Sequence, residues 1–218
     1  MRKKYKVLVY GNPNFGNLEA DSLIDVLRNV IPYLNKRFDI QFHLLLPDNV
    51  KSLEFQNVEI RKYKLPNGYN QMRTHFDVNQ FLNVVDNDYD IIYSHLPEHT
   101  LQIKKCFKNN PKIIGYSHWF EVPENTDYDN EEDYGRALFQ FIVGILEMEE
   151  CGVNSDWLKQ KFISNASKFC NGDVIAKLQR IVQPHYLGIE EIRIRKSSQK
   201  NMLFLTIEVK DILAINGS

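Results

Sequence analysis

The chain has 218 residues, of which 43% are hydrophobic and 25% charged, and its formal net charge is −1. These values are typical of a soluble globular protein that can bury a core, and the near-neutral charge argues against a protein that coats nucleic acid. The basic clusters, which we interpret as solvated strand ends, are Lys3, Lys4, Lys6 and Arg61, Lys62, Lys64.

The cysteines and the apolar runs indicate the compartment. Cys106, Cys151 and Cys170 are scattered, without a CxxC pair or the His spacing of a zinc site. They are therefore interpreted as reduced thiols in a reducing compartment. The apolar run at residues 7–10 is too short for a signal peptide, and no run approaches the roughly 20 apolar residues of a membrane span. We expect a cytoplasmic protein with no membrane span and no metal.

The first elements along the chain predict the opening of a Rossmann-like unit. Residues 6–10 form a continuous apolar run, typical of a central strand that is buried on both faces. A turn-rich loop follows at residues 11–17, and then a helix with Leu23, Leu27 and Leu34 on one side. The order is strand, glycine loop, helix.

The rest of the chain continues this alternation. Further strands are predicted at residues 40–47, 58–63, 89–97, 113–117, 151–153 and 182–189, and residues 58–63 alternate as an edge strand does. Helices are predicted at about residues 75–85, 101–107, 156–163 and 173–181, with a long helix after an acidic loop at 125–133. The pattern predicts an α/β, Rossmann-like fold with a mostly parallel sheet and helices on both faces.

Polar residues follow several of these strands, and the carboxyl ends of parallel strands share one edge where ligands bind. The loop from Gly11 to Gly16 lacks the Lys-Ser or Lys-Thr of a P-loop and is not G-x-G-x-x-G. Its backbone N–H groups could meet an anion or a sugar hydroxyl, or its glycines could serve only the dihedrals of a turn. The candidate substrate-binding residues are Gly11, Asn12, Asn14, Gly16, His95 and Glu121.

His118 is the candidate catalytic residue. An imidazole titrates near neutrality and suits a general base, and Glu121 lies three residues further on. The alternative is a histidine that bonds only to backbone, and His95 could likewise be a plain strand terminus. The spacing does not support a metal triad of His95, His118 and His185.

Two later stretches carry a resemblance to a known family. Residues 151–159, Cys-Gly-Val-Asn-Ser-Asp-Trp-Leu-Lys, resemble the NS-x-WLK element of retaining glycosyltransferases with the GT-B fold. Residues 182–190 are similar to the V-I-P-x-G-[IV]-[DE] strand that ends their N-terminal domain. The Gly11–Gly16 loop and a histidine ending a middle strand, here His118, also fit. The four motifs occur in the family's order, over about residues 5–190.

The resemblance implies a domain division and a reaction. Residues 1–195 would form the N-terminal domain, which in this family mainly holds the acceptor, and residues 196–218 a linker and the first strand of a second, donor-binding domain. His118 would contact the transferred sugar, and the glycine loop would lie near the donor's phosphates or sugar. A nucleotide sugar would be the co-substrate, with no further cofactor. Because the second domain is not present in this sequence, we expect the chain alone to be an inactive or incomplete transferase.

Other interpretations remain open. The chain could be a non-catalytic binding module that kept the fold. Its Asn-, Lys-, Ile- and Tyr-rich sequence suggests an AT-rich genome, such as a bacteriophage, where related folds transfer sugars to modified DNA bases. The net charge argues against a nucleic-acid partner. A domain face left uncovered could also be buried by homo-oligomerisation.

Overall fold

The computed structural model describes residues 4–11, 22–48, 55, 57–64, 76–117 and 131–185, and two short strands further on. The strands are β1 (Lys4–Tyr10), β2 (Asp39–Pro47), β3 (Val58–Tyr63), β4 (Ile91–Ser94), β5 (Lys112–Ser117), β6 (Glu150–Val153), β7 (Val182–Pro184), β8 (Arg195–Lys196) and β9 (Leu203–Phe204). The helices are α1 (Ser22–Arg37), α2 (Val78–Val84), the 3-10 turn η3 (Pro97–His99), α3 (Thr100–Lys105), α4 (Glu131–Leu146), α5 (Asp156–Ala166) and α6 (Gly172–Ile181).

Seven strands form one sheet in the order β3-β2-β1-β4-β5-β6-β7, and every pairing in it is parallel. β3 is an edge strand, as its alternating sequence predicts. β8 and β9 pair antiparallel with each other in a separate two-stranded sheet. The parallel order confirms the predicted Rossmann-like fold class.

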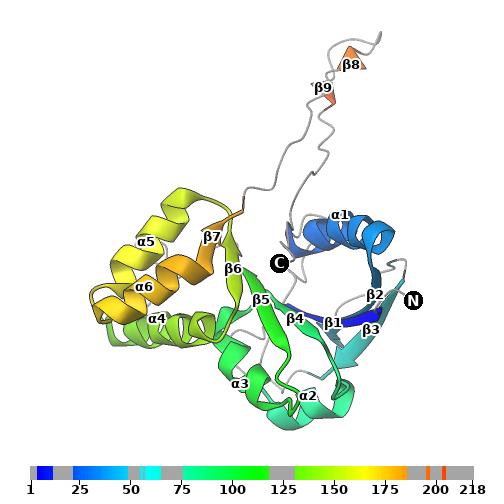
Figure 1. Cartoon of the computed structure of the whole chain (residues 1–218), viewed down its shortest axis with the longest axis horizontal. Helices are drawn as coiled ribbons and strands as arrows, with labels where there is room; N and C mark the ends of the chain where they lie inside the picture. Colours follow the sequence, from blue (N-terminus) through cyan, green and yellow to red (C-terminus); the bar gives the residue numbers. More distant parts are fainter. Residues whose placement is uncertain are drawn as a thin grey trace.

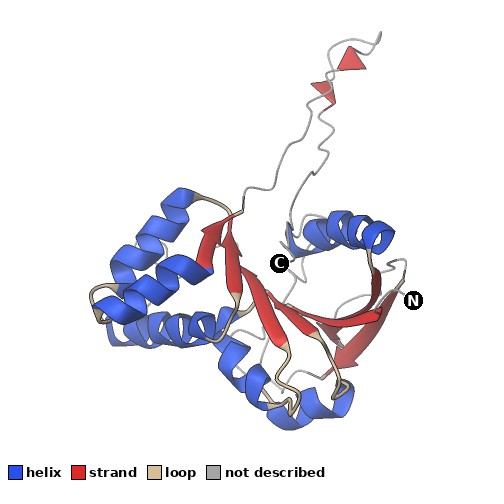
Figure 2. Ribbon diagram, viewed as in Figure 1, coloured by secondary structure: helices blue, strands red, loops and turns tan. Residues whose placement is uncertain are grey.

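Helices cover both faces of the large sheet (Figure 1; Figure 2). Val7 and Val9 of β1 pack in one hydrophobic cluster with α1, whereas Leu8 and Tyr10 belong to a second cluster with residues of α2 to α6. Successive strand residues point to opposite faces, so the continuous apolar run of β1 buries both of its sides. This confirms the interpretation of residues 6–10 as a central strand.

Several boundaries differ from the predicted ones, and at α2 a capping residue is the reason. α2 begins only at Val78, since the side chain of Asp77 accepts from the backbone N–H of Gln80 at 3.0 Å and caps the helix there. α3 ends at Lys105 rather than at residue 107, and α4 already begins at Glu131, inside the predicted acidic loop. The predicted cap of α5 is confirmed, because Ser155 accepts from the N–H of Leu158.

Among the described residues, no helix combines the length and the apolar character that crossing a bilayer requires.

Candidate functional site

The strand order reverses between β1 and β4. From β1 the sheet continues through β2 to β3 on one side and from β4 through β5 to β7 on the other. The last residues of these two strands, Tyr10 and Ser94, are register partners. Open α/β sheets bind their ligands outside the carboxyl ends of the strands at such a point. The topology therefore locates the candidate site at the carboxyl ends of β1 and β4.

Two of the predicted site residues lie at this point. Gly11 follows β1 and is buried, and the backbone N–H of His95, which follows β4, donates to the carbonyl of Tyr10 at 2.8 Å. β5 pairs with β4 and ends at Ser117, directly before His118. The other predicted site residues lie outside the described residues: Asn12, Asn14, Gly16, His118 and Glu121.

Buried polar side chains concentrate at this edge. The described part of the chain has eight buried polar or charged residues, and six of them follow or end β4 and β5: Ser94, His95, Glu98, His99, Thr100 and Ser117. Removing polar groups from water costs free energy unless they gain partners. Such a concentration at the edge where ligands bind marks the set, which we term the carboxyl-edge site, as the functional candidate.

His95 lies between two tyrosines. Its ring centroid is 4.7 Å from that of Tyr93, in an edge-to-face contact, and 6.3 Å from that of Tyr116. Burial raises the pKa of both phenols, so both stay neutral at physiological pH. Around His95 the strands β4 and β5 thus offer neutral aromatic groups with hydroxyls rather than fixed charges.

His99 has a different environment. Its Nδ1 lies 2.8 Å from the hydroxyl of Tyr10, which is fully buried, and its ring packs 5.5 Å from Phe76. Burial raises the pKa of Tyr10 well above its ordinary value, so this hydrogen bond joins a neutral phenol to the imidazole. Tyr10 belongs to the cluster with α2 to α6 and Tyr93 packs against the cluster with α1. The two imidazoles therefore contact opposite faces of the sheet.

The spacing His95-x-x-Glu98-His99 occurs in metalloproteases, where a continuous helix brings both histidines to one side. Here it spans a strand end and η3, and the two rings contact different partners. No group of three His, Cys, Asp or Glu among the described residues could hold a metal ion.

Close packing against α4 fixes η3. A Cβ on Gly144 would lie 1.7 Å from the carbonyl oxygen of Pro97, so only glycine allows this approach. On the strand side, the hydroxyl of Ser94 lies 3.2 Å from both the N–H and the carbonyl of Leu96. The turn that carries Glu98 and His99 is thereby held between β4 and α4.

The sequence interpretation assigned no role to Tyr10 or Glu98, and it placed His99 on the same edge as His95 without choosing it as a site residue. A signal was present, because Glu98 and His99 follow a strand end directly and a proline opens their turn. Their burial, however, depends on α4 and on β1, which are distant in sequence.

Comparisons with known proteins give structural neighbours only, since no family model and no curated protein matches this sequence. An E. coli trehalose-6-phosphate structure bound with UDP-2-fluoro glucose matches with 16% identity and a TM-score of 0.48, over 74% of this chain and 43% of that one. Arabidopsis thaliana UGT89C1 complexed with UDP matches with 14% identity and a TM-score of 0.47, over 84% of this chain and 52% of that one.

These structural neighbours are glycosyltransferases of the GT-B fold, the family that the sequence motifs resemble. The chain spans about half the length of the solved structures it matches. At these identities and TM-scores the similarity assigns no residue a role.

Proposed function

We propose that this chain is a GT-B-type glycosyltransferase domain that takes part in sugar transfer from a nucleotide sugar to an acceptor. The observation that carries the proposal is the carboxyl-edge site, where Gly11 and His95 lie at the point of strand reversal together with five other buried polar side chains. The sequence motifs that resemble retaining glycosyltransferases support it independently.

The chemistry of the site suits a sugar. Thr100 and Ser117 supply hydroxyls, and the imidazole of His95 can donate and accept. Neutral tyrosines beside His95 add aromatic surface and further hydroxyls. A ligand that carries many hydroxyl groups needs this mixture of donors and acceptors. His118, the residue after β5, is the proposed catalytic group, which would contact the transferred sugar.

The charge of the site limits what it does alone. The buried polar set of the described residues contains no lysine or arginine. Retaining transfer from a nucleotide sugar requires stabilisation of the departing phosphate, which positive groups provide. We therefore propose that residues 1–195 act as the acceptor side and that a donor-binding half must complete the reaction. With UDP-glucose as donor, the chain alone is expected to release little UDP.

The test is to add UDP-glucose and, separately, glucose to the isotope-labelled chain and to follow the amide NMR spectrum. Ligand-dependent shifts are expected at Gly11, at residues 94–100 and at Ser117. His95→Ala should weaken binding about tenfold, the loss of roughly one hydrogen bond to a ligand. Glu149→Gln, on an exposed residue before β6, is the control and should change nothing. Shifts confined to other surfaces would overturn the proposal.

The second candidate is a non-catalytic binding module, which the lack of cationic groups in the buried polar set favours. His118→Ala separates the two. Under the transferase proposal, this variant abolishes sugar transfer when a donor-binding half is supplied. If ligand binding is unchanged and no transfer is detected even in the parent chain with that half, the binding module is correct. A nucleic-acid acceptor would show binding that weakens steeply with salt.

A further inference from the structure

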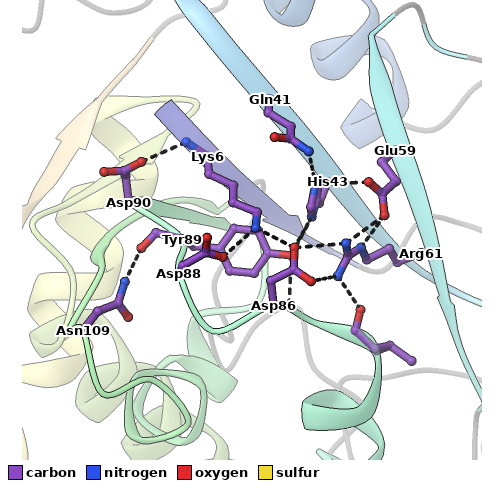
Figure 3. Close-up of polar contacts among 11 residues, drawn as sticks. Lys6, Gln41, His43, Glu59, Arg61, Asp86, Asp88, Tyr89, Asp90 and Asn109 are labelled. Carbon is purple, nitrogen blue, oxygen red and sulfur yellow. Dashed lines mark hydrogen bonds and ion pairs between the residues drawn. The ribbon is translucent and has the colours of Figure 1, made fainter. Parts of the chain in front are cut away.

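A second group of polar side chains lies around the loop that leads into the amino end of β4 (Figure 3). It joins three strands to the loop at residues 85–90, which connects α2 to β4. We term it the amino-edge cluster, and its members are Lys6, Gln41, His43, Glu59, Arg61, Asp86, Asp88 and Tyr89.

Ion pairs hold the loop to the strands. Arg61 binds both oxygens of Asp86, at 2.7 and 3.1 Å, and donates to the carbonyl of Val84 at 3.0 Å. Lys6 pairs with Asp86 at 2.6 Å and with Asp88 at 2.5 Å. The cations lower the pKa of Asp86 to about 2, chiefly through the hydrogen bonds from Arg61. The interpretation of Lys6 and Arg61 as solvated strand ends is therefore wrong, because both side chains are mostly buried in these pairs.

His43 lies at the centre of the cluster, with 1% of its side chain exposed. Its Nδ1 is 2.7 Å from the hydroxyl of Tyr89, and its Nε2 is 3.0 Å from the amide nitrogen of Gln41. An amide nitrogen only donates, so Nε2 accepts from Gln41 and the ring proton resides on Nδ1. In this arrangement His43 is neutral and both ring nitrogens have a partner.

Charged groups from three elements surround the ring. Asp86 of the loop approaches Nδ1 at 3.6 Å and Glu59 of β3 approaches Nε2 at 3.3 Å. Arg61 of β3 and Lys6 of β1 oppose a positive ring, as their charges lower its pKa. Burial is the largest cause, and the pKa of His43 lies below its ordinary value. The neutral ring is thus the stable form at pH 7.

We propose that the amino-edge cluster is a pH-sensitive latch, in which proton uptake at Nε2 of His43 replaces the hydrogen bond from Gln41 by one to Glu59 and loosens β3 and the 85–90 loop. The proton comes from solvent, and Nε2 turns from an acceptor into a donor. Gln41 then faces a donor and loses its partner. Glu59, which accepts from Arg61 at 2.8 Å, must be shared between two cations. A third positive charge is thereby added beside Lys6 and Arg61 in a buried position.

The direction of the pH effect follows from the lowered pKa. As pH falls below about 6.5, the unfolded or opened chain takes up the proton before the closed cluster does, so the free energy of opening decreases. The decrease ends once the pH is below the pKa of the closed state. The latch is therefore closed at neutral pH and weakens in mildly acidic solution.

Backbone and side-chain hydrogen bonds connect the amino-edge cluster to the start of β4. Asp90 accepts from the N–H of Lys6 at 2.9 Å through its side chain and donates its own N–H to the carbonyl of Lys6 at 2.9 Å. These bonds fix the start of β4, whose other end leads to His95. The proposal does not depend on the identity of the ligand bound there.

The test combines an NMR titration of the histidine rings with amide hydrogen exchange between pH 8 and pH 4.5, expressed as protection factors. His43 should titrate below its ordinary value, and protection in β3 and the 85–90 loop should fall over the same pH range, because the closed cluster takes up the proton less readily than the opened one. His43→Gln should remove this step. The matched control is His185→Gln, another histidine paired with a glutamate, at 2.7 Å, which should keep the step.

A second variant, changed at an exposed residue, keeps the test decisive if His43→Gln does not fold. Glu59→Gln removes the carboxylate that receives the protonated Nε2, and it should lower the titration midpoint of His43. The proposal is overturned if the step persists in His43→Gln, if His43 titrates without a change in protection, or if Glu59→Gln leaves the midpoint where it was.

Discussion

The pair of Tyr10 and His99 shows how one buried hydrogen bond supports the carboxyl-edge site. Tyr10 ends β1 and directly precedes Gly11, and its hydroxyl lies 2.8 Å from His99 on η3. Tyr10→Phe keeps the ring contacts with Phe76 and Phe81 but removes that hydroxyl. We expect a loss of about 1–3 kcal/mol in the free energy of unfolding, because a buried partner is taken from the imidazole. Urea denaturation measures it.

The matched control is Tyr33→Phe. Tyr33 lies on α1, and the guanidinium of Arg37 packs over its ring face at 4.3 Å, a contact that phenylalanine preserves. The free energy of unfolding of this variant should change by less than about 0.5 kcal/mol, as surface changes usually do. Equal losses in both variants would contradict the assigned role of the Tyr10 hydroxyl.

At the scale of elements, one glycine decides how α4 meets η3. Gly144→Ala would place a methyl group 1.7 Å from the carbonyl oxygen of Pro97 and 2.7 Å from its carbon. Backbone on both sides must move, so we expect a loss above about 3 kcal/mol or failure to fold. Because η3 carries Glu98 and His99, any folded variant should also show shifted NMR signals at the carboxyl-edge site.

The same helix offers the control. A Cβ on Gly135 meets nothing within 4 Å, so Gly135→Ala is expected to stabilise the protein by about 0.5–1 kcal/mol through the lower entropy of the unfolded chain. Thermal or urea unfolding of the two variants compares a crowded with an open position in one helix. If Gly144→Ala leaves the free energy of unfolding unchanged, α4 and η3 lie further apart than described.

At the scale of the whole molecule, both hydrophobic clusters are built from residues up to Val182. The two clusters share the seven-stranded sheet, so we expect them to unfold together. A chain that ends at residue 195, the proposed domain boundary, should fold and show one cooperative transition by circular dichroism and by tyrosine fluorescence. Non-coincident transitions, or a chain without fixed side-chain signals, would contradict residues 1–195 as a folding unit.

Much of the architecture was predictable from the sequence because its causes are local. The apolar run at residues 6–10 predicts a strand buried on both faces, and Ser155 predicts the start of α5. Alternation of strands and helices predicts a parallel sheet, since parallel neighbours need a crossover. Gly11 and His95 could be placed at the carboxyl edge for the same reason. These features depend on side-chain periodicity and capping within a few residues.

Strand order and burial, in contrast, were decided only by the tertiary structure. The order β3-β2-β1-β4-β5 places His95, rather than the strand that leads to His118, opposite Gly11. Lys6 and Arg61 appear in the sequence as exposed basic residues, yet they pair with Asp86 across three elements. Contacts between residues so far apart leave no periodic signal in the sequence, because they arise only when the sheet assembles.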